Sequence, residues 1–244
     1  MSPQPAIPHL LDERELTGRA RTHVVQFSEP RFAAQREVGE AFLAMREEAR
    51  GAGIDLVPYS GFRNFRTQLR IWNEKYSGKK PLYDIEGRPR DFSLLSSSEI
   101  IDCVLNWSAL PGGSRHQWGT EIDVIDRKKV PDNYVVKLLP EEVAPGGIFE
   151  ELHHWLDENA NRYGFFRPYG LYMGGMYPEP WQLSYAPRAM AAMQQVTVEL
   201  LTEVIREAEI LGKDEVLERI PDIYKNHILN VTLPVGEWWI PSAK

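Results

Sequence analysis

A histidine and an aspartate with six residues between them are the first candidates for chemistry in this chain. His116 lies in a Ser-Arg-His-Gln-Trp-Gly segment, where Gly119 allows the chain to turn tightly. Asp123 follows on a segment that alternates polar and apolar residues, as a half-buried strand does. Imidazole and carboxylate are both common zinc ligands, and an aspartate between apolar neighbours is costly to bury without a positive charge. Two interpretations remain open from these residues alone: a shared metal ion, or a hydrogen bond between the two side chains or to an arginine.

A second carboxylate stands where a loop rich in glycine and proline, residues 164–178, meets a predicted strand over residues 181–185. Glu179 begins this segment, which reads Glu-Pro-Trp-Gln-Leu-Ser-Tyr. If the strand lies beside residues 120–126, Glu179 faces the same cleft as Asp123 and can serve as general base towards a metal-bound water. Taken alone, a surface glutamate before a proline is the commoner outcome.

An arginine follows the predicted strand over residues 54–59, in the segment Ser-Gly-Phe-Arg that ends at Arg63. A guanidinium group in this position can hold a carboxylate through two parallel hydrogen bonds. Gln68 follows one to two turns later on a helix predicted over residues 64–76. Without further context, a solvated helix start is the commoner outcome here as well.

The remaining periodicity predicts the elements that must position these side chains. Helices are predicted over residues 29–50, 64–76, 96–107, 149–163, 187–210 and 214–230. Short strands mixed with helices, without regular βαβ alternation, predict an α+β fold: a small antiparallel sheet bearing the metal site, flanked by helices. We expect an extended N-terminal segment over residues 1–29, a main domain over 30–190 and a C-terminal helical extension over 191–244.

Two adjacent histidines on the predicted helix over residues 149–163 are weaker candidates. His153 and His154 point about 100° apart on a helix, so they cannot chelate one ion together. We expect both at the surface or near a helix end.

Composition excludes several classes of protein. The 244 residues carry a formal net charge of −7 and contain no basic run, so neither nucleic acid nor an anionic membrane is an expected partner. A single cysteine, Cys103, excludes an internal disulfide and a cysteine-based zinc site. No apolar run reaches the roughly 20 residues that span a bilayer, so no membrane insertion is expected. The N-terminus as written lacks a secretory signal, which favours the cytoplasm, or the periplasm if a signal has been removed. The oligomeric state stays open.

Together, these motifs resemble the D-alanyl-D-alanine carboxypeptidase family of zinc metallopeptidases. The family includes vancomycin-resistance-type D,D-carboxypeptidases, L,D-carboxypeptidases and phage peptidoglycan endopeptidases, in a superfamily with lysostaphin-type enzymes and the hedgehog domain. Its pattern is Ser-x-His, six residues, Asp, and later Glu-x-x-His. The residues in register with this pattern are Ser114, His116, Asp123 and Glu179. Arg63 and Gln68 resemble the family's Ser-Gly-Tyr-Arg and downstream Gln, and the resemblance covers roughly residues 30–190.

The resemblance implies a zinc-dependent enzyme that hydrolyses the terminal D-amino acid of a peptidoglycan stem peptide of the D-Ala-D-Ala type. It implies one Zn²⁺ ion held by His116, Asp123 and the residue at position 182, with Glu179 as the catalytic base. The residues that would hold the free carboxylate of the substrate are Arg63, Gln68 and Ser114.

The chain departs from the family at position 182, where Gln182 replaces the expected histidine. A neutral amide oxygen is a weaker zinc ligand than imidazole, and catalytic zinc normally has three good protein ligands. Three interpretations follow: weak zinc binding through Gln182, a non-hydrolytic relative that binds peptidoglycan peptides without cleaving them, or a residue changed to trap an inactive enzyme. A peptidoglycan endopeptidase is a further alternative, and D,D versus L,D preference stays open.

Overall fold

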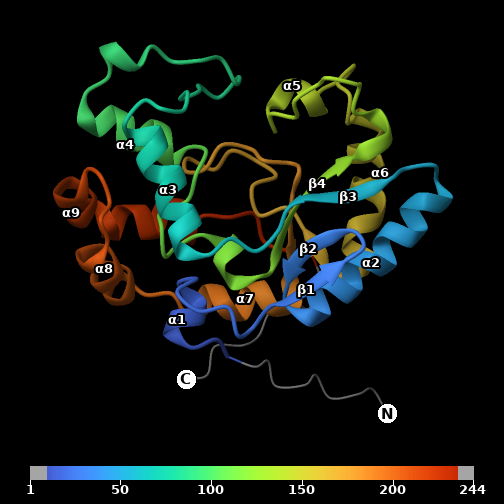
Figure 1. The fold of residues 1–244 in the computed structure, drawn as a ribbon, viewed down its shortest axis with the longest axis horizontal. Coiled ribbons are helices and arrows are strands. Elements are labelled where there is room, and N and C mark those ends of the chain that lie inside the picture. The colour runs from blue at the N-terminus through green and yellow to red at the C-terminus, as the bar shows by residue number, and fades with distance from the viewer. Residues whose placement is uncertain (1–9, 236–244) are drawn as a thin grey trace.

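The computed structural model describes residues 10–235, which form two antiparallel sheets surrounded by helices (Figure 1). The strands are β1 (Val25–Ser28), β2 (Arg31–Ala34), β3 (Leu56–Ser60), β4 (Glu121–Asp126), β5 (Phe165–Phe166) and β6 (Gln182–Tyr185). The α-helices are α1 (Glu13–Leu16), α2 (Arg36–Gly51), α3 (Phe65–Tyr76), α4 (Ser97–Leu105), α5 (Pro140–Val143), α6 (Glu150–Asn159), α7 (Ala186–Gln195), α8 (Val198–Glu207) and α9 (Lys213–Ile223). The predicted α+β fold is confirmed. Within the described residues, no helix has both the length and the apolar character needed to cross a membrane.

The four-stranded sheet has the order β3-β4-β6-β5, and every neighbouring pair is antiparallel. β4 is central, and its alternation divides its side chains between two environments. Ile122 and Val124 lie in an apolar core together with Leu183 of β6. Glu121 and Asp123 lie on the opposite face and, although polar, are also buried. One face of this sheet therefore makes the core, and the other is available for a polar site.

Helices α2 and α6 cover the apolar face (Figure 1). Phe42 and Met45 recur at helical spacing along α2 and are fully buried. Leu152 and Leu156 of α6 are one helical turn apart and join the same cluster. Burying a side chain of this size contributes roughly 1.5–3 kcal/mol, so this face anchors the sheet.

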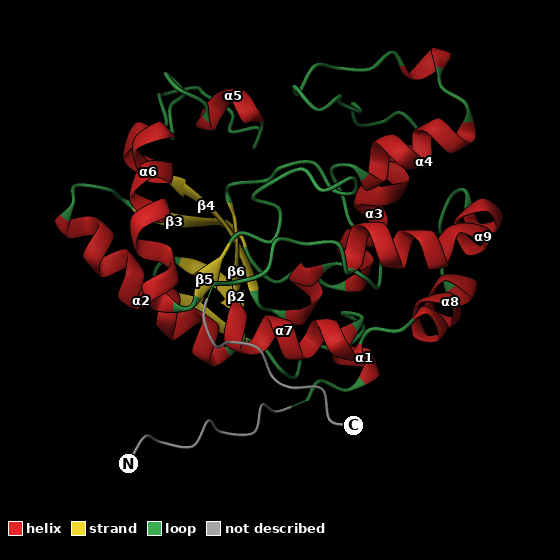
Figure 2. Ribbon diagram, turned by 180° about the vertical axis from the view of Figure 1, so that it is seen from behind, coloured by secondary structure: helices red, strands yellow, loops and turns green. Residues whose placement is uncertain are grey.

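A second group of helices, α3, α4, α8 and α9, gathers on the other side of the sheet, with α7 running beneath it (Figure 2). Trp72 of α3 and Trp118 are the largest fully buried side chains of their core. α4 begins as predicted: the Ser96 hydroxyl accepts a hydrogen bond from the backbone nitrogen of Glu99, and the Glu99 carboxylate accepts one from the backbone of Ser96.

Three predicted elements differ in the structure. The prediction of one continuous helix over residues 187–210 is wrong, because the helix breaks between α7 and α8. Val196 is extended, and the Thr197 hydroxyl caps α8 by accepting a hydrogen bond from the backbone nitrogen of Leu200. The helix predicted over residues 29–50 begins only at Arg36, after strand β2. The described part of the segment expected to be extended contains α1 and β1. Residues 1–9 and 236–244 of the two predicted terminal segments lie outside the described residues.

The C-terminal extension contacts the glycine-rich loop that leads to β6. The side-chain nitrogen of Asn230 donates a hydrogen bond to the carbonyl of Met173 at 2.7 Å, and the backbone nitrogen of Thr232 donates one to the carbonyl of Pro168 at 2.8 Å. Gly175 lies so close to this extension that a Cβ atom would stand 1.8 Å from the carbonyl oxygen of Asn226. The extension therefore fixes the loop from outside the sheet.

Candidate metal centre and cleft

His116 lies on a short 3-10 turn, Arg115–Trp118, that leads into β4. Gly119 ends this turn in the left-handed region, with φ of 70°, and a Cβ there would stand 2.5 Å from Val24. The Nδ1 atom of His116 is 2.8 Å from the carbonyl oxygen of Gly61. Because a carbonyl oxygen can only accept, Nδ1 carries the proton in the neutral ring, and Nε2 keeps its lone pair. The turn therefore directs Nε2 of the ring towards Asp123, and this is the nitrogen that could bind a metal ion.

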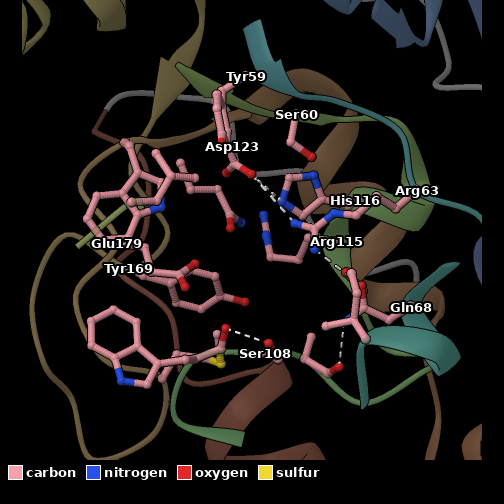
Figure 3. A pocket seen from close by; sticks show the side chains of 18 of the residues that line it. Tyr59, Ser60, Arg63, Gln68, Ser108, Arg115, His116, Asp123, Tyr169 and Glu179 are labelled. Carbon is pink, nitrogen blue, oxygen red and sulfur yellow. Dashed lines mark hydrogen bonds and ion pairs between the residues drawn. The ribbon is translucent and has the colours of Figure 1, made fainter. Parts of the chain in front are cut away.

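The side chain of Asp123 lies beside the His116 ring. One carboxylate oxygen, Oδ2, lies 3.4 Å from Nε2 of His116 and 3.6 Å from Nη2 of Arg63 (Figure 3). Burial alone would raise the pKa of the Asp123 carboxyl, but attraction to His116 and Arg63 outweighs it and holds that pKa below its usual range. Asp123 is therefore an ionised carboxylate in a buried position.

Two buried atoms at this point have no hydrogen-bond partner among the described residues: Nε2 of His116 and Oδ1 of Asp123. Leaving such atoms unpaired is costly, and a nitrogen lone pair beside a carboxylate is the donor set that a divalent zinc ion prefers. The residues present therefore fit a cation. Within residues 10–235, no three side chains of the His, Cys, Asp and Glu types gather, so a third protein ligand must be of another type.

Gln182 carries a side-chain oxygen of that other type and lines the same cleft. It lies opposite Asp123 in the β4–β6 pairing, which sends both side chains to the same face of the sheet. Its side-chain nitrogen donates a hydrogen bond to Oε2 of Glu121 at 3.2 Å. Because the nitrogen end of the amide is engaged in this way, the carbonyl end is left to face the cleft that Gln182 lines with His116.

A fully buried ion pair stands behind Gln182. The Nε atom of Arg115 is 3.3 Å from Oε1 of Glu121, and neither side chain is exposed. The Ser184 hydroxyl donates to Glu121 at 2.7 Å and accepts from Arg115 at 2.8 Å. The Arg115 guanidinium also lies over the Trp118 ring, 4.8 Å from its centroid. This pair was not predicted from the sequence, although charged residues beside His116 and Asp123, in a segment that must be buried, were a usable signal.

Glu179 lies across the cleft from Arg63 (Figure 3). Its backbone nitrogen donates to the carbonyl of Tyr169 at 2.9 Å, which ties it to the glycine-rich loop. Burial, reinforced by the negative charge of Asp123, raises the pKa of Glu179 to about 8. A cation held by His116 and Asp123 would favour the ionised form of Glu179 and make it a proton acceptor.

The side chains predicted to hold the substrate carboxylate line the same cleft. Nη1 of Arg63 donates to the side-chain oxygen of Gln68 at 3.4 Å, and the side-chain nitrogen of Gln68 donates to the carbonyl of Ala109 at 2.8 Å. Ser114 is buried and belongs to the cleft wall. The cleft has a volume of about 380 Å³. All the predicted site residues meet in it: Arg63, Gln68, Ser114, His116, Asp123, Glu179 and Gln182.

Comparison with known proteins gives a family for this arrangement. The sequence model described as VanY, D-alanyl-D-alanine carboxypeptidase, matches residues 31–188. An uncharacterized protein of Haemophilus influenzae is 34% identical over 122 residues, which is 49% of this chain and 93% of that protein. A D-alanyl-D-alanine carboxypeptidase of Enterococcus faecalis is 28% identical over 145 residues, which is 57% of this chain and 43% of that protein. Among solved structures, the LD-carboxypeptidase LdcB aligns with a TM-score of 0.50 at 20% identity, covering 86% of this chain and 80% of that chain.

Proposed function

Because the chain belongs to the VanY family of D-alanyl-D-alanine carboxypeptidases, we propose that it is a zinc-dependent carboxypeptidase that removes the terminal D-amino acid from peptidoglycan stem peptides. One observation carries this proposal: the unpartnered Nε2 of His116 and Oδ1 of Asp123 meet in a cleft that also contains Glu179. A cation site beside a carboxylate of raised pKa is the arrangement that amide hydrolysis needs.

His116, Asp123 and the side-chain oxygen of Gln182 would hold the ion. Bound Zn²⁺ supplies Lewis-acid chemistry, polarising the scissile carbonyl and acidifying the attacking water. Glu179 accepts the proton of that water and returns it to the leaving amine, so one carboxyl acts first as base and then as acid.

Arg63 binds and orients the free carboxylate at the end of the substrate. Its guanidinium can offer two parallel N–H groups, and Gln68 fixes its direction through the hydrogen bond to Nη1. Ser114 contributes a hydroxyl in the same wall of the cleft. A grip on a free carboxylate restricts cleavage to the last amide of a peptide.

The test is release of D-alanine from a peptide ending in D-Ala-D-Ala, in the presence of Zn²⁺. We expect release by the parent protein and none by Glu179→Ala, with zinc content equal in the two proteins. Equal release of D-alanine by the two proteins would show that Glu179 takes no part in the reaction.

Gln182 supports a second candidate, a protein that binds peptidoglycan peptides without cleaving them. A neutral ligand lowers the affinity for zinc and can leave recognition by Arg63 intact. Binding of the peptide with no release of D-alanine, at zinc concentrations that saturate the site, would favour this candidate over the carboxypeptidase.

A further inference from the structure

The cleft is rich in positive charge although the chain as a whole carries −7. Its basic lining residues are Arg63, Lys75, Lys80, Arg115 and Lys137. Four of them have a carboxylate oxygen within 4.0 Å, contributed by Asp123, Glu74, Glu121 and Glu141 respectively. Lys75 has none within the described part of the chain. Its ammonium group therefore has no ion-pair partner within 4.0 Å among the described residues, although the charge of the more distant Glu179 carboxylate acts on it.

Lys75 is fixed in place by a neutral group. Its Nζ atom donates to the Ser108 hydroxyl at 2.7 Å, and that hydroxyl donates in turn to the carbonyl of Trp107 at 2.7 Å. One of the three ammonium N–H groups is used in this way, and two remain for a ligand. Burial lowers the pKa of Lys75 to about 8, so the group is still mostly charged at neutral pH. A half-buried ammonium without a close ion-pair partner is unfavourable, and an anion entering the cleft would relieve this cost.

The position of Lys75 indicates which part of a substrate it meets. Gln68, Ile71 and Lys75 follow one another along a single face of α3 and line the cleft. The Lys75 charge interacts with the charges of both Glu179 and Arg63. In the proposed reaction, Glu179 protonates the amine of the released residue and Arg63 holds its α-carboxylate. Because the Lys75 charge acts on both of these groups, Lys75 lies near the same residue of the substrate.

We propose that Lys75 and Ser108 bind a second carboxylate of the substrate, carried by the side chain of the terminal residue that is released. This inference rests on the proposed function, since the orientation of the peptide comes from the roles of Arg63 and Glu179. It specifies the substrate class as peptides with an acidic residue at the end, so that two carboxylates enter the cleft together.

The test is calorimetric binding of two peptides to the Zn²⁺-loaded Glu179→Ala variant, which does not consume them. The peptides end in D-Ala-D-Glu and D-Ala-D-Gln and differ only in the charge of the last side chain. We expect the D-Glu peptide to bind about tenfold more tightly, because a charge-assisted hydrogen bond replaces a neutral one.

Adding Lys75→Met, which keeps most of the length of the side chain and removes its charge, should abolish this preference and leave the affinity for the D-Gln peptide within about twofold. Lys80→Met is the matched control: Lys80 lines the same cleft but already pairs with Glu74, so the preference should persist. Thermal unfolding of each variant checks that it is folded.

Equal affinity of the Glu179→Ala variant for the two peptides would overturn the inference. So would a Lys75→Met variant that weakens both peptides by the same factor, because the ammonium would then contact the α-carboxylate. The proposed hydrolysis is tested separately, by release of D-alanine from the active protein. If the active protein releases D-alanine but the D-Glu peptide binds no more tightly, only this inference is wrong. If the D-Glu peptide binds more tightly but no D-alanine is released, only the proposed hydrolysis is wrong.

Discussion

The side-chain nitrogen of Gln182 donates a hydrogen bond to the Glu121 carboxylate at 3.2 Å. This contact distinguishes the two ends of the amide, since a carboxylate accepts from nitrogen and repels oxygen. In the residue that departs from the family pattern, the amide oxygen is therefore the end that is free to meet a ligand in the cleft.

A histidine in place of Gln182 should strengthen the proposed metal site. We expect Gln182→His to tighten Zn²⁺ binding by about tenfold or more, because imidazole is a better zinc ligand than a neutral amide. Glu121 can accept a hydrogen bond from the N–H of the new ring, on the nitrogen that does not face the ion, and so orient the ring. Calorimetric titration of both proteins with Zn²⁺ measures the difference, and equal affinities would show that position 182 does not contact the ion.

The buried pair Arg115–Glu121 should show strong coupling in stability. Arg115→Met and Glu121→Leu each leave one charge buried without its partner, and each should lower the free energy of unfolding by about 3–5 kcal/mol. The double variant removes both charges, so its loss should be well below the sum of the two single losses. Urea unfolding of the four proteins gives the coupling energy, and additive losses would mean that the two charges do not stabilise each other.

His153 should make the protein sensitive to acid. Burial, with the nearby Arg167 charge, lowers the pKa of His153 from 6.5 to about 3, and Nδ1 of the neutral ring faces the Arg167 guanidinium at 3.2 Å. The unfolded chain takes up the proton at higher pH than the folded one. The contribution of this residue is therefore complete above pH 6.5 and is lost as the pH falls towards 3.

Urea unfolding of the metal-free protein between pH 7 and pH 5 measures this loss. His153→Asn keeps an acceptor near the position of Nδ1 but does not titrate. We expect the parent to lose up to about 2 kcal/mol more than this variant over that range, at a limit of about 1.4 kcal/mol per pH unit. Parallel curves for the two proteins would contradict the assignment.

Any side chain at position 175 should destabilise the protein, because Gly175 lies against the C-terminal extension. A Cβ atom would stand 1.8 Å from the Asn226 carbonyl oxygen, which is backbone and cannot rotate away. We expect Gly175→Ala to cost about 3 kcal/mol in unfolding free energy. Gly51→Ala is the control, since no atom lies within 4 Å of its added Cβ at the end of α2, and we expect it to be neutral or stabilising by up to about 1 kcal/mol. Equal stability of the two variants would show that the loop shifts freely.

Local pattern was enough to predict the sheet face that carries the candidate site. The alternation through Glu121, Ile122, Asp123 and Val124 determines which side chains share a face, because the period of a strand is two. The turn before β4 was predictable from Gly119, which adopts the left-handed conformation that glycine favours. The wider convergence with Glu179 and Arg63 came from the family resemblance, since each of those segments is ambiguous when taken alone.

Other features depend on contacts that a linear pattern does not contain. The break between α7 and α8 was missed because Val196 is buried and continues the apolar pattern across it. His153 was expected at the surface or near a helix end, but it is buried beside Arg167, which follows it by fourteen residues. The isolation of Lys75 could not be predicted at all, because it depends on which carboxylates come near after folding.

The C-terminal extension lies beyond residues 31–188, the part that matches the family, and it supplies none of the proposed ligands. Asn230 and Thr232 nonetheless bond to the loop that ends at Glu179. A different sequence after the last strand would therefore place the Glu179 carboxyl differently relative to His116 and Asp123. Exchange of this region between family members offers a way to change substrate preference while every metal ligand stays as it is.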